Sequence, residues 1–199
     1  MSSSRGMREK IVGENFEMDG KPFTFVMLKP LGMEIAGHIL ARLHEIGQIR
    51  CAVPATITPY DIEAHYGEKV NKRYFPAIVE YLSGKETYKI ILQARSYGNP
   101  TDYVNFVRKE VGTLKPHENE LGTVRHLAMD YRLPYMQIVP QEDPDLQQFC
   151  YDNLVHTSDS FDNVMREVNI WFRDQPEIIF KALASYFLQI DDGRNGSEI

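Results

Sequence analysis

The sequence has few cysteines and no long apolar run. Cys51 and Cys150 are the two cysteines among 199 residues, which is too few for a disulfide framework and indicates reduced thiols. No stretch approaches the roughly 18 consecutive apolar residues that a membrane-spanning helix needs. The start of the chain also lacks the apolar centre of a secretory signal. We therefore expect a cytoplasmic protein that has no membrane partner.

Positive charge is scarce as well. The chain has 22 Lys and Arg against 28 Asp and Glu, a formal net charge of −6. This balance disfavours bulk attraction to nucleic acid or to anionic lipid, so an anionic ligand would need a local cluster of cations. Hydrophobic residues make up 43% and charged residues 25%, a composition typical of globular proteins that excludes wholesale disorder and a fibrous repeat.

Between two polar ends, the pattern predicts one domain. Residues 1–20 are expected to form a flexible arm, residues 21–190 a single domain and residues 191–199 a flexible tail. The expected strands are 23–28, 49–57, 88–94 and a short one that ends at 153–155; the expected helices are 34–46, 58–66, 74–82, 101–111, 161–172 and 177–189. Thr58, Thr101 and Ser160 are the expected N-caps. This order predicts an α+β sandwich of the ferredoxin-like kind, with helices on one face of a four-stranded antiparallel sheet.

Two segments do not belong to that simple pattern. Residues 126–152 are very polar and are broken by Pro134, Pro140 and Pro144, so we interpret them as a long surface insertion rather than core. The helix at 177–189 carries an apolar stripe, which needs a partner. We expect the stripe to pack on the domain, with a homo-oligomer as the other means of covering it.

One of six histidines has a setting suited to chemistry. The histidine spacings give no metal-binding motif. His156, however, falls where an apolar strand ends and a polar turn, residues 157–160, leads into a helix that carries Glu167. An imidazole in such a turn can act as a nucleophile, and a carboxylate can orient it. On position alone, an ordinary turn histidine is the better interpretation.

The surrounding residues change that balance, because several segments between residues 23 and 173 match one known pattern in order. They are Phe25-Val26-Met27-Leu28-Lys29-Pro30, His65-Tyr66, Tyr74-Phe75-Pro76, Gly122-Thr123-Val124-Arg125, Asn153 to Ser160, Glu167 and Trp171-Phe172. Together these segments resemble the nucleoside diphosphate kinase family. Several motifs in the right order are far more specific than one short pattern.

The resemblance implies transfer of the γ-phosphate of a nucleoside triphosphate, typically ATP, to a nucleoside diphosphate. The reaction would be ping-pong, through a phosphohistidine at His156. Glu167 and Ser158 match the groups that hold the ring, and Tyr66 matches a tyrosine beside it. The implied nucleotide-binding residues are the phosphate-binding cations Lys29, Arg108 and Arg125, the ribose contacts Lys29 and Asn153, the base platform Tyr74, the apolar base-slot positions Ile78 and Cys150, and the phosphate-contact position Leu114. Mg²⁺ would bridge the phosphates without a direct protein ligand, and Asp159 could reach it through water.

The chain also departs from the family pattern. The family's Lys-Pro-Asp-Gly is Lys29-Pro30-Leu31-Gly32 here, so a carboxylate is missing at position 31. A phosphate-contacting threonine aligns with Leu114, whereas Thr113 lies one place earlier. Either the loop shifts by one residue or the backbone makes this contact.

Three functions therefore remain to be separated. The first is an active nucleoside diphosphate kinase, supported by the presence of the histidine, the glutamate and the three cations. The second is a regulatory nucleotide-binding protein of the same fold with weak or no kinase activity. The third, an unrelated RNA-binding module, is disfavoured by the charge of −6.

Overall fold

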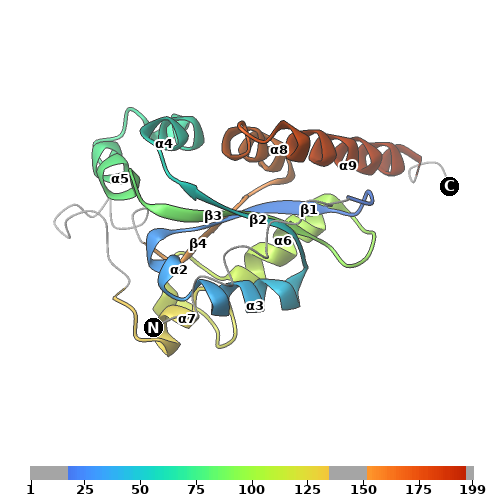
Figure 1. The fold of residues 1–199 in the computed structure, drawn as a ribbon. Coiled ribbons are helices and arrows are strands. Elements are labelled where there is room, and N and C mark those ends of the chain that lie inside the picture. Colours follow the sequence, from blue (N-terminus) through green and yellow to red (C-terminus); the bar gives the residue numbers. More distant parts are fainter. Residues whose placement is uncertain (1–17, 135–151, 196–199) are drawn as a thin grey trace, which may run out of the picture.

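The computed structural model describes residues 18–134 and 152–195, with side chains up to residue 188 (Figure 1). Its centre is a four-stranded sheet in the order β2-β3-β1-β4, in which every neighbouring pair is antiparallel. The strands are β1 (Phe23–Leu28), β2 (Gln48–Thr56), β3 (Glu86–Gln93) and β4 (Val155–Thr157). The α+β, four-stranded antiparallel fold predicted from the sequence is confirmed.

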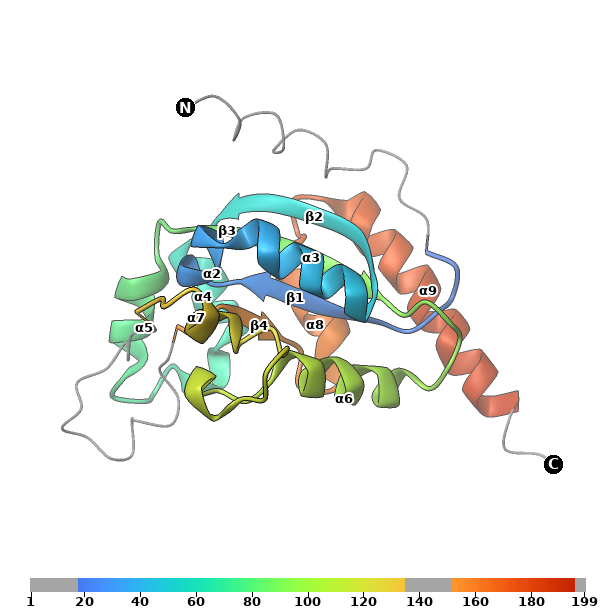
Figure 2. The ribbon, with the colours of Figure 1, turned by 90° about the horizontal axis from the view of Figure 1, so that it is seen from below.

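Helices cover both faces of this sheet, so the prediction of one covered face is wrong. One layer contains α4 (Pro59–His65), α5 (Phe75–Leu82), α8 (Phe161–Trp171) and α9 (Pro176–Asn195). The other contains α2 (Pro30–Glu34), α3 (Ala36–Ile46), α6 (Pro100–Val111) and α7 (Leu127–Asp130), and Figure 2 shows α3 in front of the strands. Two short 3-10 helices, Gly67–Lys69 and Pro116–Glu118, lie in the loops.

The alternation of side chains along β1 explains the two layers. Phe25 and Met27 pack into one hydrophobic cluster, whereas Val26 and Leu28 pack into a second cluster on the opposite face. All six residues of β1 are buried. A strand that is apolar on both faces needs cover on both, and that requirement places β1 in the middle of the sandwich.

Local signals define most helix starts. Thr58 forms a capping box with Asp61, and Ser160 accepts a hydrogen bond from the backbone N–H of Asn163, as predicted for both caps. The predicted cap at Thr101 is wrong. Asn99 caps α6 instead, because its side chain accepts the N–H groups of residues 101 and 102 while Pro100 takes the first helical position.

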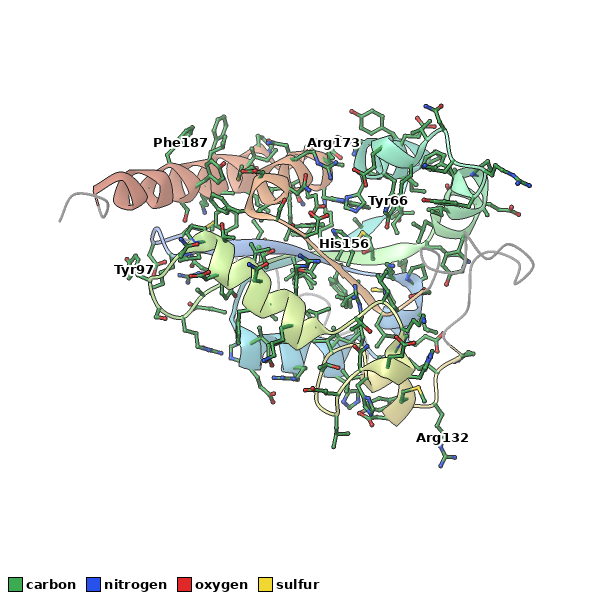
Figure 3. The ribbon with its side chains drawn as sticks, turned by 180° about the vertical axis from the view of Figure 1, so that it is seen from behind. Tyr66, Tyr97, Arg132, His156, Arg173 and Phe187 are labelled. Atoms are coloured by element: carbon green, nitrogen blue, oxygen red, sulfur yellow. The ribbon has the colours of Figure 1, made fainter. Side chains whose placement is uncertain are left out.

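The C-terminal helix is longer than predicted, since α9 continues to Asn195 rather than ending near residue 189. Ile178 and Ala182 pack into the core, which confirms packing on the domain. Phe180 and Phe187 remain exposed on the outer side of the helix, and Figure 3 shows Phe187 pointing away from the sheet. The homo-oligomer stays a prediction.

Each end of the predicted surface insertion contains a buried residue, although residues 129–132 are exposed as predicted. Ala128 and Asp152 are fully buried, because α7 packs under the sheet and Asp152 lies between helices α2 and α5. Residues 135–151, including Cys150, and most of the predicted N-terminal arm lie outside the described residues. Within the part of the chain that is described, no helix has the length and apolarity needed to cross a bilayer.

Candidate active site

The candidate nucleophile lies on the edge strand β4. His156 is the middle residue of this three-residue strand and pairs with Met27 of β1. Pairing continues beyond the strand, because the N–H of Ser158 donates to the carbonyl of Phe25 at 3.1 Å. The prediction that His156 stands in a turn after the strand is therefore wrong by one or two residues. A side chain on a paired strand is held more firmly than one in a turn.

Glu167 of α8 binds the imidazole. Oε2 of Glu167 lies 3.1 Å from Nε2 of His156 and accepts a 2.6 Å hydrogen bond from the hydroxyl of Ser158. Because an ionised carboxylate only accepts, Nε2 must carry the proton. The lone pair of the neutral ring is then on Nδ1, which is the atom left for attack on an electrophile.

His65, at the end of α4, packs against the same pair. Its ring centroid lies 4.4 Å from that of His156, with the two rings nearly perpendicular. The indole N–H of Trp171 donates to Nδ1 of His65 at 3.1 Å. Burial is the largest cause that lowers the pKa of His65 well below 6.5, and the positive charge of Arg166 acts in the same direction. His65 is therefore a neutral wall of the site, with its own proton on Nε2.

A cavity of about 960 Å³ opens beside His156. It is lined by most of the residues predicted for catalysis and phosphate binding, together with further cations. The predicted residues in its wall are Tyr66, Arg108, Leu114, Arg125, His156, Asp159 and Glu167, and the additional cations are Lys69, Lys109, Lys115 and Arg166. Figure 3 places His156 near Tyr66 in this region. The wall also carries the carboxylates of Glu68, Glu118 and Glu120 besides Asp159 and Glu167, so six cations face five acids and the cavity is slightly cationic in a chain whose net charge is −6.

Two of these cations are held in different ways. Arg108 is exposed, and its guanidinium donates to the carbonyl of Asp159 at 2.9 Å. Arg125 is 8% exposed and donates to the carbonyls of Gly112 and Val155 at 2.7 and 2.9 Å. Burial lowers the pKa of Arg125 to about 10, so it remains charged at neutral pH. Its buried Nε has no hydrogen-bond partner within the described residues, which suits a buried cation that faces an anionic ligand.

Lys29 and Asn153 lie next to the cavity rather than in its wall. The positive charge of Lys29 contributes to lowering the pKa of His65, after burial and the effects of three other residues. Asn153 is fully buried and donates from Nδ2 to the carbonyl of Leu114 at 3.0 Å. Its Oδ1 lacks a partner among the residues described. This contact links the strand that carries His156 to the loop around position 114.

The predicted base platform is not exposed in this structure. Tyr74 and Ile78 are 8% and 5% exposed, belong to the hydrophobic core and do not line the cavity. Tyr74 immediately precedes α5, and the packing of this helix on the sheet buries its ring. Cys150, the third base-slot residue, lies outside the described residues.

Several residues of the site had no predicted role. His65, Asn163, Arg166 and Trp171 form part of the wall or support it. Arg166 lies 3.6 Å from Oε1 of Glu167, and Asn163 donates to the carboxylate of Asp159 at 2.7 Å. Asn163 lies four residues after Asp159 and four before Glu167, and Arg166 directly precedes Glu167, so closeness in sequence was the available signal for these two residues.

One group of possible metal ligands occurs within the described part of the chain. The ligand atoms of His65, His156 and Glu167 lie within 4.8 Å of one another. These side chains already have hydrogen-bonding roles, with Trp171 donating to His65 and His156 donating to Glu167. We therefore assign the group to ring orientation.

The site combines a histidine on a strand, a carboxylate that accepts a hydrogen bond from this histidine, and a cationic cavity. These features define a class of site in which an imidazole receives an anionic group. Comparison with known proteins gives the family. A family model described as nucleoside diphosphate kinase matches residues 23–176. The chain therefore belongs to the nucleoside diphosphate kinase family, whose proteins transfer phosphoryl groups between nucleotides.

Individual relatives agree with this result. The nucleoside diphosphate kinase of Methanobrevibacter smithii is 29% identical over 155 residues, covering 76% of this chain and 87% of the relative. That of Methanosphaera stadtmanae is also 29% identical, with 76% and 86% covered.

Solved structures share the fold. A nucleoside diphosphate kinase family protein from Babesia bovis has a TM-score of 0.58 at 24% identity, covering 78% of this chain and 90% of that chain. The Borrelia burgdorferi nucleoside-diphosphate kinase, solved as a transition-state mimic with vanadate and ADP, has a TM-score of 0.57 at 19% identity, with 76% and 87% covered.

Proposed function

We propose that this protein is an active nucleoside diphosphate kinase that moves the γ-phosphate of a nucleoside triphosphate to a nucleoside diphosphate through phosphorylated His156. The observation that carries the proposal is the 3.1 Å contact between Nε2 of His156 and Glu167 beside a cationic cavity. That contact leaves Nδ1 of His156 as the atom that can attack phosphorus.

In the first half-reaction, Nδ1 attacks the γ-phosphorus. A nitrogen–phosphorus bond forms, the bond from that phosphorus to the bridging oxygen breaks, and the nucleoside diphosphate leaves with the bonding electrons. The ring becomes cationic as the bond forms, and the carboxylate of Glu167 stabilises that charge through Nε2. A second nucleoside diphosphate then attacks the phosphohistidine and takes the group, restoring the neutral ring.

The cations supply the electrostatic part of catalysis. Phosphoryl transfer spreads negative charge over the equatorial oxygens, so positioned positive charges lower the barrier. We assign this role to Arg108, Arg125 and Lys29. We also assign the ribose contacts to Lys29 and Asn153. Because Asn153 is fully buried here, its unpartnered Oδ1 could accept a hydrogen bond from a ribose hydroxyl only if the nucleotide uncovers it. Tyr74 and Ile78 could serve as a base slot only if the nucleotide uncovers them, because both are buried here.

The residues of the cavity also fit Mg²⁺, the metal that the family typically uses. Asp159 is an exposed carboxylate in the cavity wall, and its hydrogen bond from Asn163 lowers its pKa, so it stays ionised. It can accept hydrogen bonds from waters on a magnesium ion whose other ligands are phosphate oxygens. When bound, the ion would neutralise charge on the phosphates.

The test is phosphorylation of the protein itself. Protein mixed with γ-labelled ATP and Mg²⁺ should acquire a label that is stable to base, labile to acid and transferable to GDP. His156→Ala should abolish the label, whereas the matched control His117→Ala, at an exposed position, should retain it. Labelling that survives His156→Ala would place the nucleophile elsewhere. Binding of ATP by the wild-type protein without labelling would favour the regulatory alternative.

A further inference from the structure

Asp152 is a fully buried carboxylate that three donors satisfy. Its Oδ2 accepts the backbone N–H of Leu31 at 2.8 Å and the hydroxyl of Tyr81 at 2.7 Å, and its Oδ1 accepts the N–H of Leu154 at 3.2 Å. In the described part of the chain, no lysine or arginine forms an ion pair with it. Burial of a charge is costly unless strong hydrogen bonds compensate, so these three bonds must persist for Asp152 to stay in place.

The three bonds join segments that lie far apart in the sequence. Leu31 is in the first turn of α2, Tyr81 is near the end of α5, and Leu154 leads into β4. The same junction has a backbone bond, because the N–H of Lys29 donates to the carbonyl of Leu154 at 2.8 Å. Lys29, the N-cap residue of α2, is thus tied directly to the segment that leads to His156.

Two further features show how closely residues 29–32 pack against residues 152–154. Gly32 packs so closely on Leu154 that a Cβ at position 32 would overlap the carbonyl oxygen that Lys29 uses. Leu154 has a φ of +75°, a conformation that is costly for a branched side chain and persists only where the surroundings impose it. The hydrogen bond from its N–H to Asp152 is one such constraint.

The sequence explains why a carboxylate is needed here. Position 31, where the family pattern has an aspartate, is Leu31 in this chain. The first turn of α2 therefore has no acidic side chain of its own, and Lys29 provides no side-chain cap. Asp152 places a negative charge at that helix start from another part of the fold, which satisfies an N–H group and favours the helix dipole.

We infer that Asp152 is a positioning residue, which holds the backbone of Lys29 in place so that this lysine can bind the nucleotide. This inference rests on the proposed function for the identity of the ligand. Asp152 is buried behind α2 and is absent from the cavity lining, so it acts through Lys29 rather than on the nucleotide.

The test is a double-mutant cycle on ADP affinity. Asp152→Asn should weaken ADP binding by about tenfold, because the loss of one acceptor and of the charge loosens the junction. In a Lys29→Ala background, the same change should alter affinity by less than about twofold, because the group that Asp152 positions is already gone. Tyr81→Phe, which removes one of the three donors, should give a smaller effect in the same direction.

The controls separate positioning from general stability. Asp174→Asn removes an exposed carboxylate and should leave ADP affinity unchanged in both backgrounds. Urea unfolding is measured for each variant, and Asp152→Asn is used because Asp152→Ala leaves three buried donors without an acceptor and can prevent folding. Equal losses of affinity in the wild-type and Lys29→Ala backgrounds would overturn the inference.

The same experiment distinguishes this inference from the proposed function. If the wild-type protein binds ADP but acquires no label from ATP, the kinase proposal fails while the cycle still decides the role of Asp152. If labelling succeeds and the cycle is additive, the kinase proposal stands and the positioning role fails. A wild-type protein that binds no ADP would overturn both.

Discussion

Nε2 of His156 and Oε2 of Glu167 lie 3.1 Å apart although one is carried by an edge strand and the other by a helix. The first turns of α8 hold this relationship, because the cap at Ser160 fixes where the helix begins and Glu167 lies two turns further on. Ser158 binds the same carboxylate oxygen, so the acceptor is fixed before any substrate arrives.

Glu167→Gln tests the electrostatic role of this carboxylate. The amide can still accept the proton of Nε2, but it cannot stabilise the cationic ring, so we expect phosphorylation by ATP to slow by roughly 100-fold. ADP affinity should change little, since Glu167 touches the histidine rather than the phosphates. Rapid-quench measurement of the labelled protein gives the rate, with the exposed Glu63→Gln as control. An unchanged rate for Glu167→Gln would exclude the role.

Stability should fall as the pH drops below about 6.5, because of His65. Its pKa is lowered chiefly by burial, so the folded protein keeps the ring neutral while the unfolded chain takes up a proton below 6.5. The unfolded state then binds more protons than the folded state, so the contribution of this group is complete above pH 6.5 and is lost toward acid. Urea unfolding across this range should show a steeper loss for the wild-type protein than for His65→Gln. Equal slopes would contradict the assignment.

Alanine variants of Arg125 and Arg108 should both weaken ADP binding, but only the Arg125 variant should also lose stability. Arg125→Ala removes two hydrogen bonds to backbone carbonyls and should lower the free energy of unfolding by about 1–3 kcal/mol as well as ADP affinity. Arg108→Ala, at an exposed side chain, should weaken ADP binding with a change in stability within about 0.5 kcal/mol. Calorimetric ADP titration and urea unfolding measure the two effects. Loss of stability in both variants alike would show that the two cations are not held differently.

Gly32→Ala should shift the backbone of Lys29 without changing any residue of the cavity wall. The added Cβ overlaps the carbonyl oxygen of Leu154, a backbone atom that also accepts the N–H of Lys29. We expect weaker ADP binding together with lower stability, as backbone must shift to make room. Gly37→Ala is the matched control, because a Cβ there meets nothing within 4 Å. A Gly32→Ala protein that matches this control in both measurements would contradict the close packing.

Leu114→Thr should have a small effect. The structure uses the carbonyl of Leu114, rather than its side chain, to bind Asn153, and the side chain itself is 45% exposed. We expect ADP affinity to change by less than about threefold, equivalent to well under 1.4 kcal/mol. Asn153→Ala, which breaks the same contact from the other side, should weaken binding clearly. A gain of more than about tenfold on Leu114→Thr would show that the hydroxyl contact is missing and needed.

Local patterns explain what the sequence predicts well. The strands and helices follow from short apolar runs and capping residues, and Thr58 and Ser160 lie where those signals place them. His156, Ser158 and Glu167 are close in sequence, so a strand followed by a helix brings them together. The stripe on α9 likewise shows its buried side through Ile178 and Ala182.

Contacts between distant segments explain what the sequence does not predict. His65 meets Trp171 across 106 positions, and Leu31 meets Asp152 across 121. No local pattern reports such pairs. The helices on the second face of the sheet were not predicted for the same reason. The apolar sequence of β1 shows that the strand is buried, but not that helices cover both faces of the sheet. The family resemblance matched Tyr74 to a residue that stacks on the base, but it did not predict that Tyr74 is buried here by the packing of α5.

The close fit of Gly32 against Leu154 has a practical meaning for protein engineering. A designer who transplants the histidine-bearing strand into another scaffold would have to bring the glycine turn with it, although the two pieces are encoded at opposite ends of the domain. Recombination between homologues that divides the domain between these two pieces would therefore preserve the contact only where the parent that supplies the first piece has glycine at this position.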